Sequence, residues 1–439
     1  MNLKNALVGA TALVSVSATA ALAASHSSTI TIATVNNGDM VRMQALTGKF
    51  NEAHPDINVE WVTLEENVLR QNVTTDITTG GGAYDVITIG TYEVPIWGKN
   101  DWLVSLNDGM ADDWNAADLL PAIAGGLTVD DNLYAAPFYG ESSMVMYRKD
   151  LMEKAGLEMP EAPTWDFIRE AAAAMTDRDN EINGICARGK AGWGENMAFL
   201  TAMSNSFGAR WFDEDWQAQF DSDAWANTLN FYLDMMAESG PQGAANNGFN
   251  ENLTLFQQGK CGMWIDATVA ASFVTGDDST VADQVGFALA PDNGLGKRGN
   301  WLWAWSLAVP SSSDNIDAAK TFISWATSQG YTEIVAAEEG WANVPPGTRT
   351  SLYENADYLA AAPFAEMTLK SILSADPTNP TVDPVPYTGV QFVAIPEFAG
   401  IANQVGQEFS AALAGQQSAE EALENAQELT TEEMEAAGY

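Results

Sequence analysis

Hydrophobic and polar positions in the first ninety residues follow two periods in turn. Alternation over residues 29–35 and 57–61 predicts two strands, and a short apolar run at 85–89 predicts a third, buried strand. Apolar residues recur at helical spacing over 40–50, and residues 64–79 have a helical pattern that three glycines end. Strands that alternate with helices at this spacing predict a mainly parallel α/β sheet.

The same two periods return after residue 140 and predict a second sheet. Short strands are expected at residues 143–147, 262–265 and 286–289. Thr164 and Ser418 precede helical patterns and are placed to cap them. We find no internal repeat and no low-complexity linker between the halves. The chain of 439 residues is therefore expected to form two lobes joined by several short crossings.

Residues 1–23 carry a pattern of their own. Lys4 precedes a small, apolar run at residues 6–20, and Ala21-Leu22-Ala23 fits the small-x-small pattern of a cleavage site. A membrane anchor needs about 20 strongly apolar residues, and this run is shorter and rich in alanine. We therefore predict a cleavable export signal, with a retained N-terminal helix as the alternative. The mature protein is expected in the periplasm.

Charge narrows the range of partners. The chain has 19 Lys+Arg against 59 Asp+Glu, a net charge of −40. Removal of residues 1–23 takes away Lys4 and no acidic residue, which changes −40 to −41. Such a field repels nucleic acid and anionic membranes, so we expect neither as a partner. An acidic surface suited to a saline habitat is the favoured interpretation, and a specific cationic partner is the alternative.

Cysteine, histidine and motif content argue against an enzyme. Cys186 and Cys261 are the two cysteines, and the sequence leaves open whether they pair in an oxidising compartment. His26 and His54 are the two histidines, so a zinc site or a Cys–His pair is not expected. The sequence contains no dinucleotide fingerprint, P-loop, HExxH or GxSxG motif. We expect no catalytic residue, no metal and no cofactor.

Tryptophan is the distinctive residue, with fifteen copies of which several stand in loops beside polar residues. Trp193 lies between glycines, and Trp341 opens a Pro-rich loop. An aromatic plane covers the C–H face of a polyhydroxylated ligand, while carboxylate, amide and guanidinium groups bind its hydroxyls. Alternation places Trp301, Trp303 and Trp305 on one face of a strand, where a core role and a binding role are equally open.

Several ordered motifs carry a family resemblance. Tyr147-Arg148-Lys149-Asp150-Leu151, Pro163-Thr164-Trp165-Asp166, Gly259-Lys260-x-Gly262-Met263 and Ile395-Pro396-Glu397 occur in this order. Together they resemble the extracellular solute-binding proteins of ABC importers, in the sugar-binding cluster around maltose-binding protein. The resemblance covers essentially the whole mature chain.

A finer resemblance points to the sorbitol/mannitol-binding branch of that cluster. It rests on the sequence segments at residues 88–97, 192–197, 263–268 and 340–347. The family implies a class II-like periplasmic-binding-protein fold, in which two α/β lobes close on a ligand about a hinge.

The resemblance also implies where the hinge lies. Crossings are expected near residues 137–142, 303–309 and 347–353. The N-terminal lobe would then comprise residues 24–138 plus 306–350. The C-terminal lobe would comprise residues 139–305 plus 351–439.

Loops at the carboxyl ends of parallel strands supply the candidate site, because open α/β sheets bind ligands there. Tyr92, Trp303 and Trp341 are expected to stack on the carbon chain of the ligand. Carboxylates and an amide would accept hydrogen bonds from hydroxyls, and Arg349 would donate. The expected ligand-binding residues are Asn37, Glu65, Tyr92, Glu93, Glu141, Trp193, Asp266, Trp303, Trp341 and Arg349.

These features lead to one hypothesis and two alternatives. The hypothesis is a monomeric substrate-binding component of an ABC importer, which captures a sorbitol- or mannitol-type sugar alcohol and delivers it to a membrane permease. One alternative is a binding protein for a mono- or disaccharide. The other is a secreted carbohydrate-active enzyme, since the same aromatics occur with abundant Asp and Glu.

Overall fold

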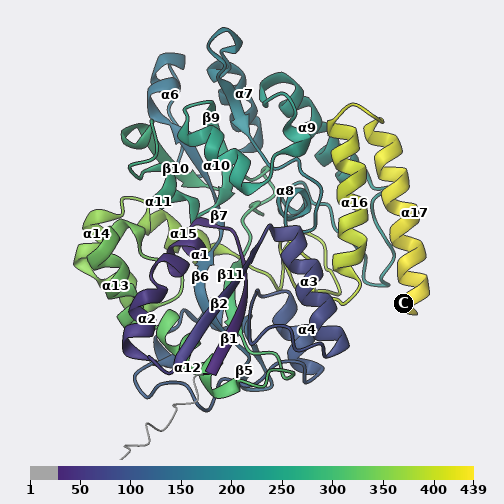
Figure 1. The fold of residues 1–439 in the computed structure, drawn as a ribbon. Helices are drawn as coiled ribbons and strands as arrows, with labels where there is room; N and C mark the ends of the chain where they lie inside the picture. The colour runs from purple at the N-terminus through teal and green to yellow at the C-terminus, as the bar shows by residue number, and fades with distance from the viewer. Residues whose placement is uncertain (1–27) are drawn as a thin grey trace, which may run out of the picture.

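The structure is a computed structural model that describes residues 28–439. The expected export signal at residues 1–23 lies outside the described residues. The described chain forms two α/β lobes, each built on one central sheet with helices packed on its faces (Figure 1). None of the helices in residues 28–439 has the length and apolar character required to cross a membrane.

The first sheet has five strands in the order β2-β1-β3-β11-β6. β1 pairs in parallel with β2 and β3, whereas β11 runs antiparallel to β3 and β6. Its central strands β3 and β11 are buried along their whole length because helices cover both faces of the sheet. The strands are β1 (Ser28–Val35), β2 (Ile57–Leu64), β3 (Val86–Ile89), β6 (Ala135–Glu141) and β11 (Trp303–Ala308).

The second sheet has four strands in the order β10-β7-β9-β8. β7 runs antiparallel to β9 and β10, and β8 is parallel to β9. The strands are β7 (Ser143–Arg148), β8 (Asn183–Cys186), β9 (Cys261–Ala267) and β10 (Val285–Leu289). A two-stranded ribbon adds β4 (Thr128–Val129) and β5 (Asn132–Leu133).

Each sheet is thus mixed, with one strand opposing the others. The periodicity predicted mainly parallel sheets, and the two reversed strands are the ones next to lobe crossings. β7 follows β6 after Ser142 alone, and β11 begins where the chain returns from the second lobe at Trp303. Each of these strands enters its lobe at the edge of the sheet where a neighbouring strand ends, since Ser143 pairs with Ala267 and Trp303 pairs with Glu141, so it runs in the opposite direction.

The lobe boundaries expected at 138/139 and 305/306 differ from the strand boundaries. β6 continues to Glu141 and β11 already begins at Trp303, and these two residues are register partners in the first sheet. The ladder between β6 and β11 therefore places the division between the sheets at Ser142 and just before Trp303. The third expected crossing lies against β6, where the Gly140 N–H donates to the Pro346 carbonyl at 2.9 Å.

Helices of the first lobe follow the predicted pattern with one interruption. The pattern at residues 40–50 forms two helices, because the backbone turns at Leu46. Glu65 caps α3 by accepting from the Asn67 N–H. The helices are α1 (Gly38–Ala45), α2 (Thr47–Ala53), α3 (Glu66–Thr79), α4 (Glu93–Lys99), α5 (Pro121–Gly125), α12 (Ile316–Ala326) and α13 (Gln329–Glu339).

Helices of the second lobe include the two whose caps were predicted. Thr164 accepts from the Phe167 N–H, and Ser418 accepts from the Glu421 N–H. The C-terminal pair α16 and α17 packs on α8 and α9 (Figure 1). The helices are α6 (Lys149–Ala155), α7 (Trp165–Met175), α8 (Asn196–Ser206), α9 (Asp223–Ser239), α10 (Phe249–Gln257), α11 (Ala270–Val274), α15 (Ala365–Ser374), α16 (Phe398–Leu413) and α17 (Ala419–Ala437).

Shorter elements complete the described chain. α14 (Ala356–Ala361) packs against the 3₁₀ turns η5 and η6. The 3₁₀ turns are η1 (Ala116–Asp118), η2 (Arg178–Asn180), η3 (Ala244–Asn246), η4 (Ala282–Gln284), η5 (Trp341–Asn343) and η6 (Thr350–Glu354).

One disulfide bond fastens the edge of the second sheet. Cys186 at the end of β8 is bonded to Cys261 at the start of β9, with their Cα atoms 5.8 Å apart. Both side chains are fully buried. The question that the sequence left open is thus answered, and the bond secures edge strand β8 to its neighbour.

Candidate functional site

A cavity lies between the two lobes, at the ends of strands from both sheets. The space between its side chains, including its opening to solvent, is about 430 Å³. The lining residues come from strands, helices and loops of both lobes. They are Asn37, Glu66, Arg70, Tyr139, Glu141, Arg188, Trp193, Gly194, Ala198, Phe249, Ala267, Val269, Trp301, Trp303, Trp305 and Gln391.

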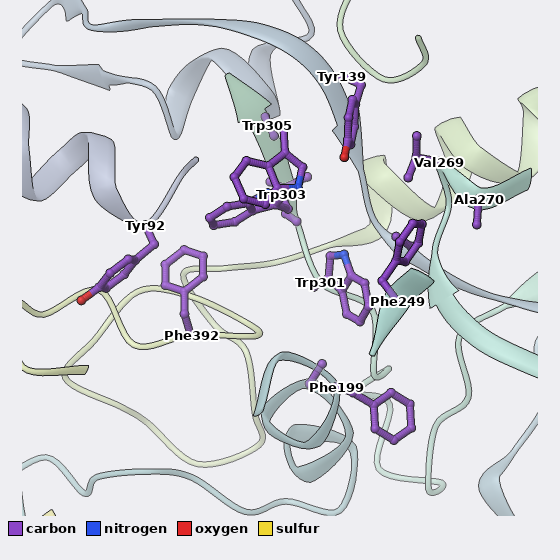
Figure 2. Packing of buried hydrophobic residues seen from close by; sticks show 14 of the residues in the cluster. Tyr92, Tyr139, Phe199, Phe249, Val269, Ala270, Trp301, Trp303, Trp305 and Phe392 are labelled. Carbon is purple, nitrogen blue, oxygen red and sulfur yellow. The ribbon is translucent and has the colours of Figure 1, made fainter. Parts of the chain in front are cut away.

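Aromatic rings form most of the apolar wall. Trp303 and Trp305 follow alternation on β11, so they share a face of the strand, and their ring centroids are 5.5 Å apart. Trp193 of the second lobe contacts Trp303 edge-on at 5.8 Å. In Figure 2, Trp301, Trp303, Trp305 and Phe249 surround one common space. The tryptophan run is therefore both buried and part of the cavity wall.

Arg70 on α3 organises one side of the cavity. It donates to Glu66 Oε1 through Nε at 3.0 Å and Nη2 at 2.8 Å, and to Glu93 Oε1 through Nη1 at 2.6 Å. The Arg70 guanidinium also lies over the Trp193 ring, 3.9 Å from its centroid. Because Trp193 belongs to the other lobe, this cation–π contact joins the two lobes at the cavity wall.

Arg188 organises the opposite side. It follows β8 and binds Asp266 at the end of β9 in a bidentate pair, with bonds of 2.8 and 2.6 Å. It also donates to the Gly194 carbonyl at 2.7 Å. Asp266 accepts further bonds from the Trp264 indole and the Ala267 N–H. The arginine and the carboxylate are both buried, so each satisfies the other and fixes its orientation.

Glu141 has a different environment. It is the last residue of β6 and is almost fully buried at the cavity. Burial raises its pKa to about 8, with Asp266 and Glu66 raising it further and Arg188 opposing the shift. Burial likewise raises the pKa of the neighbouring Glu195 to about 7. Two carboxyl groups near this cavity therefore hold protons more tightly than an exposed glutamate does.

Four of the ten predicted site residues line the cavity. They are Asn37, Glu141, Trp193 and Trp303. The Asn37 amide donates to the Tyr139 hydroxyl at 3.0 Å, which leaves the Asn37 carbonyl oxygen and the Tyr139 O–H for another partner.

Three further predicted residues lie directly behind the wall. Glu93 and Asp266 are held by the two arginines. Tyr92 packs against Trp193 with ring centroids 4.9 Å apart, and its hydroxyl donates to the Ile395 carbonyl at 3.0 Å. Burial raises the pKa of Tyr92.

Glu65 lies at the rim between the lobes. Its carboxylate accepts from Asn67 N as a helix cap and from Lys190 Nζ of the second lobe at 2.5 Å. Lys190 is also 3.6 Å from Glu195. Glu65 therefore links the two lobes and does not line the cavity.

Trp341 and Arg349 lie away from the cavity, together at another surface hollow of the first lobe. The Arg349 guanidinium donates to the backbone carbonyls of Trp114, Asn115 and Thr327, and it is 3.6 Å from Asp118. These internal partners occupy its donors, which makes it a structural arginine. The expectation that Arg349 donates to a ligand in this cavity does not fit the placement.

Residues that the sequence reasoning did not select include Glu66, Arg70, Arg188 and Gln391. Two signals were available for the arginines. Arg70 stands four residues after Glu66 on one helix, which is the spacing of an ion pair. Arg188 stands two residues after the end of β8, near a strand end like several of the predicted residues. Gln391 carried no such signal, because it reaches the cavity from a segment without regular structure.

The fold and the cavity define a class, that of two-lobe proteins which bind a small molecule between their lobes. The chain belongs to the family of bacterial extracellular solute-binding proteins, whose model matches residues 36–333. Members of this family bind solutes and are not enzymes.

Individual relatives are close in sequence and structure. The chain is 55% identical over 419 residues to the mannitol-binding protein of Pseudomonas aeruginosa, covering 95% of this chain and 96% of that protein. It is 69% identical to an ABC transporter solute binding protein of Agrobacterium vitis S4, solved with bound D-mannitol, with a TM-score of 0.93. That match covers 94% of this chain and 99% of the other.

A more distant structure shares the fold. The solute binding protein of Agrobacterium radiobacter K84 in complex with ribitol is 23% identical, with a TM-score of 0.82. The match covers 92% of this chain and 98% of that one. At this identity, the likeness establishes the architecture alone.

Proposed function

We propose that this protein captures a hexitol of the D-mannitol type between its two lobes and delivers it to the permease of an ABC importer. The observation that carries the proposal is the cavity between the lobes, which combines a tryptophan wall with carboxylates oriented by Arg70 and Arg188. The similarity to two mannitol-binding proteins supports the same ligand class.

The chemistry of a linear polyol fits this lining. A hexitol has a hydroxyl on every carbon and a flexible backbone, so ordering it costs about 0.5–1.5 kcal/mol per mobile group. The site offsets that cost with charge-assisted hydrogen bonds, which are about twice as strong as neutral ones. A buried polar group left unmatched costs about 1–3 kcal/mol, and this penalty discriminates between stereoisomers. The tryptophan faces cover the C–H edges.

We assign direct ligand contacts to Asn37, Glu141, Trp193 and Trp303, with Asp266 presented through Arg188. The lobes that close are those carrying the two sheets, divided at Ser142. The protein acts as a monomer in this proposal, because the cavity is complete within one chain.

A thermal-shift panel tests the ligand class. We expect D-mannitol and sorbitol to raise the melting temperature, with smaller shifts for arabitol and none for glucose or maltose. At 100 times its dissociation constant, a ligand stabilises the folded state by roughly 2.7 kcal/mol. Titration calorimetry then gives the stoichiometry, expected to be one hexitol per chain.

Two results would reject the proposal. A shift with maltose or glucose and none with any hexitol would favour the saccharide-binding alternative. Cleavage of an oligosaccharide by the purified protein would favour the carbohydrate-active enzyme. The panel must also include a buffer blank of matched osmolality, since polyols at high concentration stabilise proteins without binding.

The periplasmic location is part of the proposal and has its own test. The family is extracellular, and residues 1–23 have the pattern of an export signal. Protein recovered by osmotic shock from a Gram-negative host should begin at Ala24 by N-terminal sequencing. Recovery of the intact N-terminus in the cytoplasmic fraction would contradict export.

A further inference from the structure

Five carboxyl groups surround the cavity, and two arginines form ion pairs with four of them. Glu66 and Glu93 share the guanidinium of Arg70. Asp266 takes the bidentate pair with Arg188. A fourth carboxyl, Glu195, is 3.5 Å from Arg188 and 3.6 Å from Lys190. The fifth is Glu141.

Glu141 has no such counter-charge. Within residues 28–439, no Lys or Arg nitrogen lies within the 4.0 Å limit of an ion pair from its carboxyl oxygens. The groups that face it are Arg188 after β8, Asp266 on β9, Glu66 on α3 and the Trp301 side chain, a hydrogen-bond donor. Tyr139, two residues earlier on β6, faces it as well. Arg188 is already engaged by Asp266 and the Gly194 carbonyl, and burial of the Glu141 carboxyl outweighs the opposing effect of the Arg188 charge.

We propose that Glu141 is a neutral carboxylic acid in the closed site and donates a hydrogen bond to a hydroxyl of the ligand. This inference rests on the proposed function, since it assigns a role within that site. A buried charge without a partner is strongly unfavourable, and binding a proton removes it. The raised pKa of Glu141 agrees with this reasoning.

The proton complements the other groups of the site. Glu66 in the lining is an acceptor, and a hydroxyl of a polyol has one hydrogen to donate to it. A neutral acid instead donates to a lone pair of a hydroxyl oxygen. An ammonium group has no lone pair to accept that bond. Glu141 is therefore a specificity-determining residue that favours neutral hexitols over their 1-amino-1-deoxy analogues.

Calorimetric titration with D-mannitol from pH 6 to pH 9.5 measures the effect. The wild type should bind with constant affinity at low pH, and its affinity should fall about tenfold per pH unit above the pKa of about 8, because binding then requires uptake of one proton. Glu141→Gln retains a donor and should bind with a flat pH profile. Glu60→Gln, an exposed glutamate on β2, is the matched control and should follow the wild type.

Three outcomes would overturn the proposal. The first is an affinity of the wild type that rises with pH. The second is a wild-type pH profile that persists in Glu141→Gln. The third is tighter binding of 1-amino-1-deoxy-D-mannitol than of D-mannitol at pH 7. Each indicates an ionised Glu141 or no role for it.

Infrared spectroscopy on the unliganded protein separates this proposal from the proposed function. The difference spectrum between wild type and Glu141→Gln at pH 6.5 should contain a carboxylic-acid C=O band that disappears above pH 9. A spectrum with carboxylate bands alone at pH 6.5 would refute the proton on Glu141. If the band is present but no hexitol binds the wild type at any pH, the proton stands and the ligand assignment fails.

Discussion

At the scale of single residues, two arginines determine how the acceptors of the cavity are presented. The chain has only 19 Lys and Arg against 59 Asp and Glu, yet both Arg70 and Arg188 are buried at this cavity. Each fixes its carboxylate partners with two or more donors. A fixed acceptor loses little freedom when a hydroxyl binds to it, so the arginines act through orientation.

Trp303 provides the sharpest test of the aromatic wall. Its ring contacts Trp193, Trp305 and Phe392, so it lies where both lobes meet the cavity. We expect Trp303→Ala to weaken D-mannitol binding by about 2 kcal/mol, roughly 30-fold, as measured by calorimetry. Trp341→Ala is the matched control, because Trp341 lies at a different hollow, and its affinity should stay near that of wild type. Equal losses in both variants would remove Trp303 from the binding wall.

Glu141 also makes stability depend on pH in the unliganded protein. The pKa of a glutamate in the unfolded chain is near 4.5, and that of folded Glu141 is about 8. Between these values the folded state keeps a proton that the unfolded chain releases, so stability falls as pH rises, by at most about 1.4 kcal/mol per pH unit. Glu141→Gln removes this slope. Urea unfolding should show that the free energy of unfolding of wild type falls relative to that of Glu141→Gln as the pH rises from 4.5 to 8. A difference between the two proteins that does not change with pH would contradict the effect of burial on the pKa of Glu141.

Individual site residues were predictable where strand ends alone place them. Asn37 and Glu141 follow from the rule that ligands bind at the carboxyl ends of strands, and those ends meet at the cavity. Trp341 follows from the same rule and lies at another hollow, together with Arg349, whose partners at Trp114, Asn115 and Thr327 come from segments distant in sequence. The local sequence pattern identifies a loop, but it does not show which segments, distant in the sequence, pack around that loop.

At the scale of elements, periodicity predicted β1, β2, β3, β7, β9 and β10 and several helices, but not β6 and not the direction of every strand. β7 and β11 oppose their sheets because a crossing immediately precedes each of them. All residues of Ala135–Glu141 are buried, so no change in the pattern marks where the first sheet ends. The sequence therefore did not indicate that this sheet extends beyond residue 138. Pairing between β6 and β11, a long-range contact, sets that boundary.

The disulfide is an element-scale constraint with a measurable effect. It joins β8, an edge strand, to β9 and closes a loop of 75 residues. Removing such a link increases the entropy of the unfolded chain, and the expected loss of stability is about 2–4 kcal/mol. We expect Cys186→Ala/Cys261→Ala to unfold at lower denaturant concentration by this amount. Dithiothreitol should destabilise the wild type and leave the double variant unchanged, and an equal response in both would contradict the role of the bond.

At the scale of the whole molecule, the lobes meet along both flanks of the cavity. On one flank the Asn67 amide donates to the Ala191 carbonyl at 3.1 Å, next to the ion pair of Lys190 with Glu65. On the other, Arg42 of the first lobe lies 5.4 Å from the ring centroid of Phe273 in the second. Few chain crossings join the lobes, so these contacts and the ligand determine how far the lobes close.

Gly194 is the residue on which closure can be tested without altering either lobe. It belongs to the second lobe, and a Cβ at this position would clash with the Glu66 carboxylate and lie 2.9 Å from Arg70 Nε, both of the first lobe. Opening the lobes relieves that clash, so Gly194→Ala should fold normally but close poorly. Gly400→Ala is the matched control, since a Cβ there meets nothing within 4 Å.

Small-angle scattering with and without D-mannitol reads out closure directly. The radius of gyration of wild type and Gly400→Ala should decrease when the ligand binds. Gly194→Ala should keep its larger radius at a ligand concentration that saturates the wild type, and its affinity should be about 10- to 100-fold weaker, because a ligand stabilises the closed state only by its differential affinity for it. If Gly194→Ala contracts like the wild type at equal affinity, the Gly194 contact with Glu66 and Arg70 does not limit closure. A change in melting temperature common to both glycine variants would instead indicate an effect of the substitution on folding.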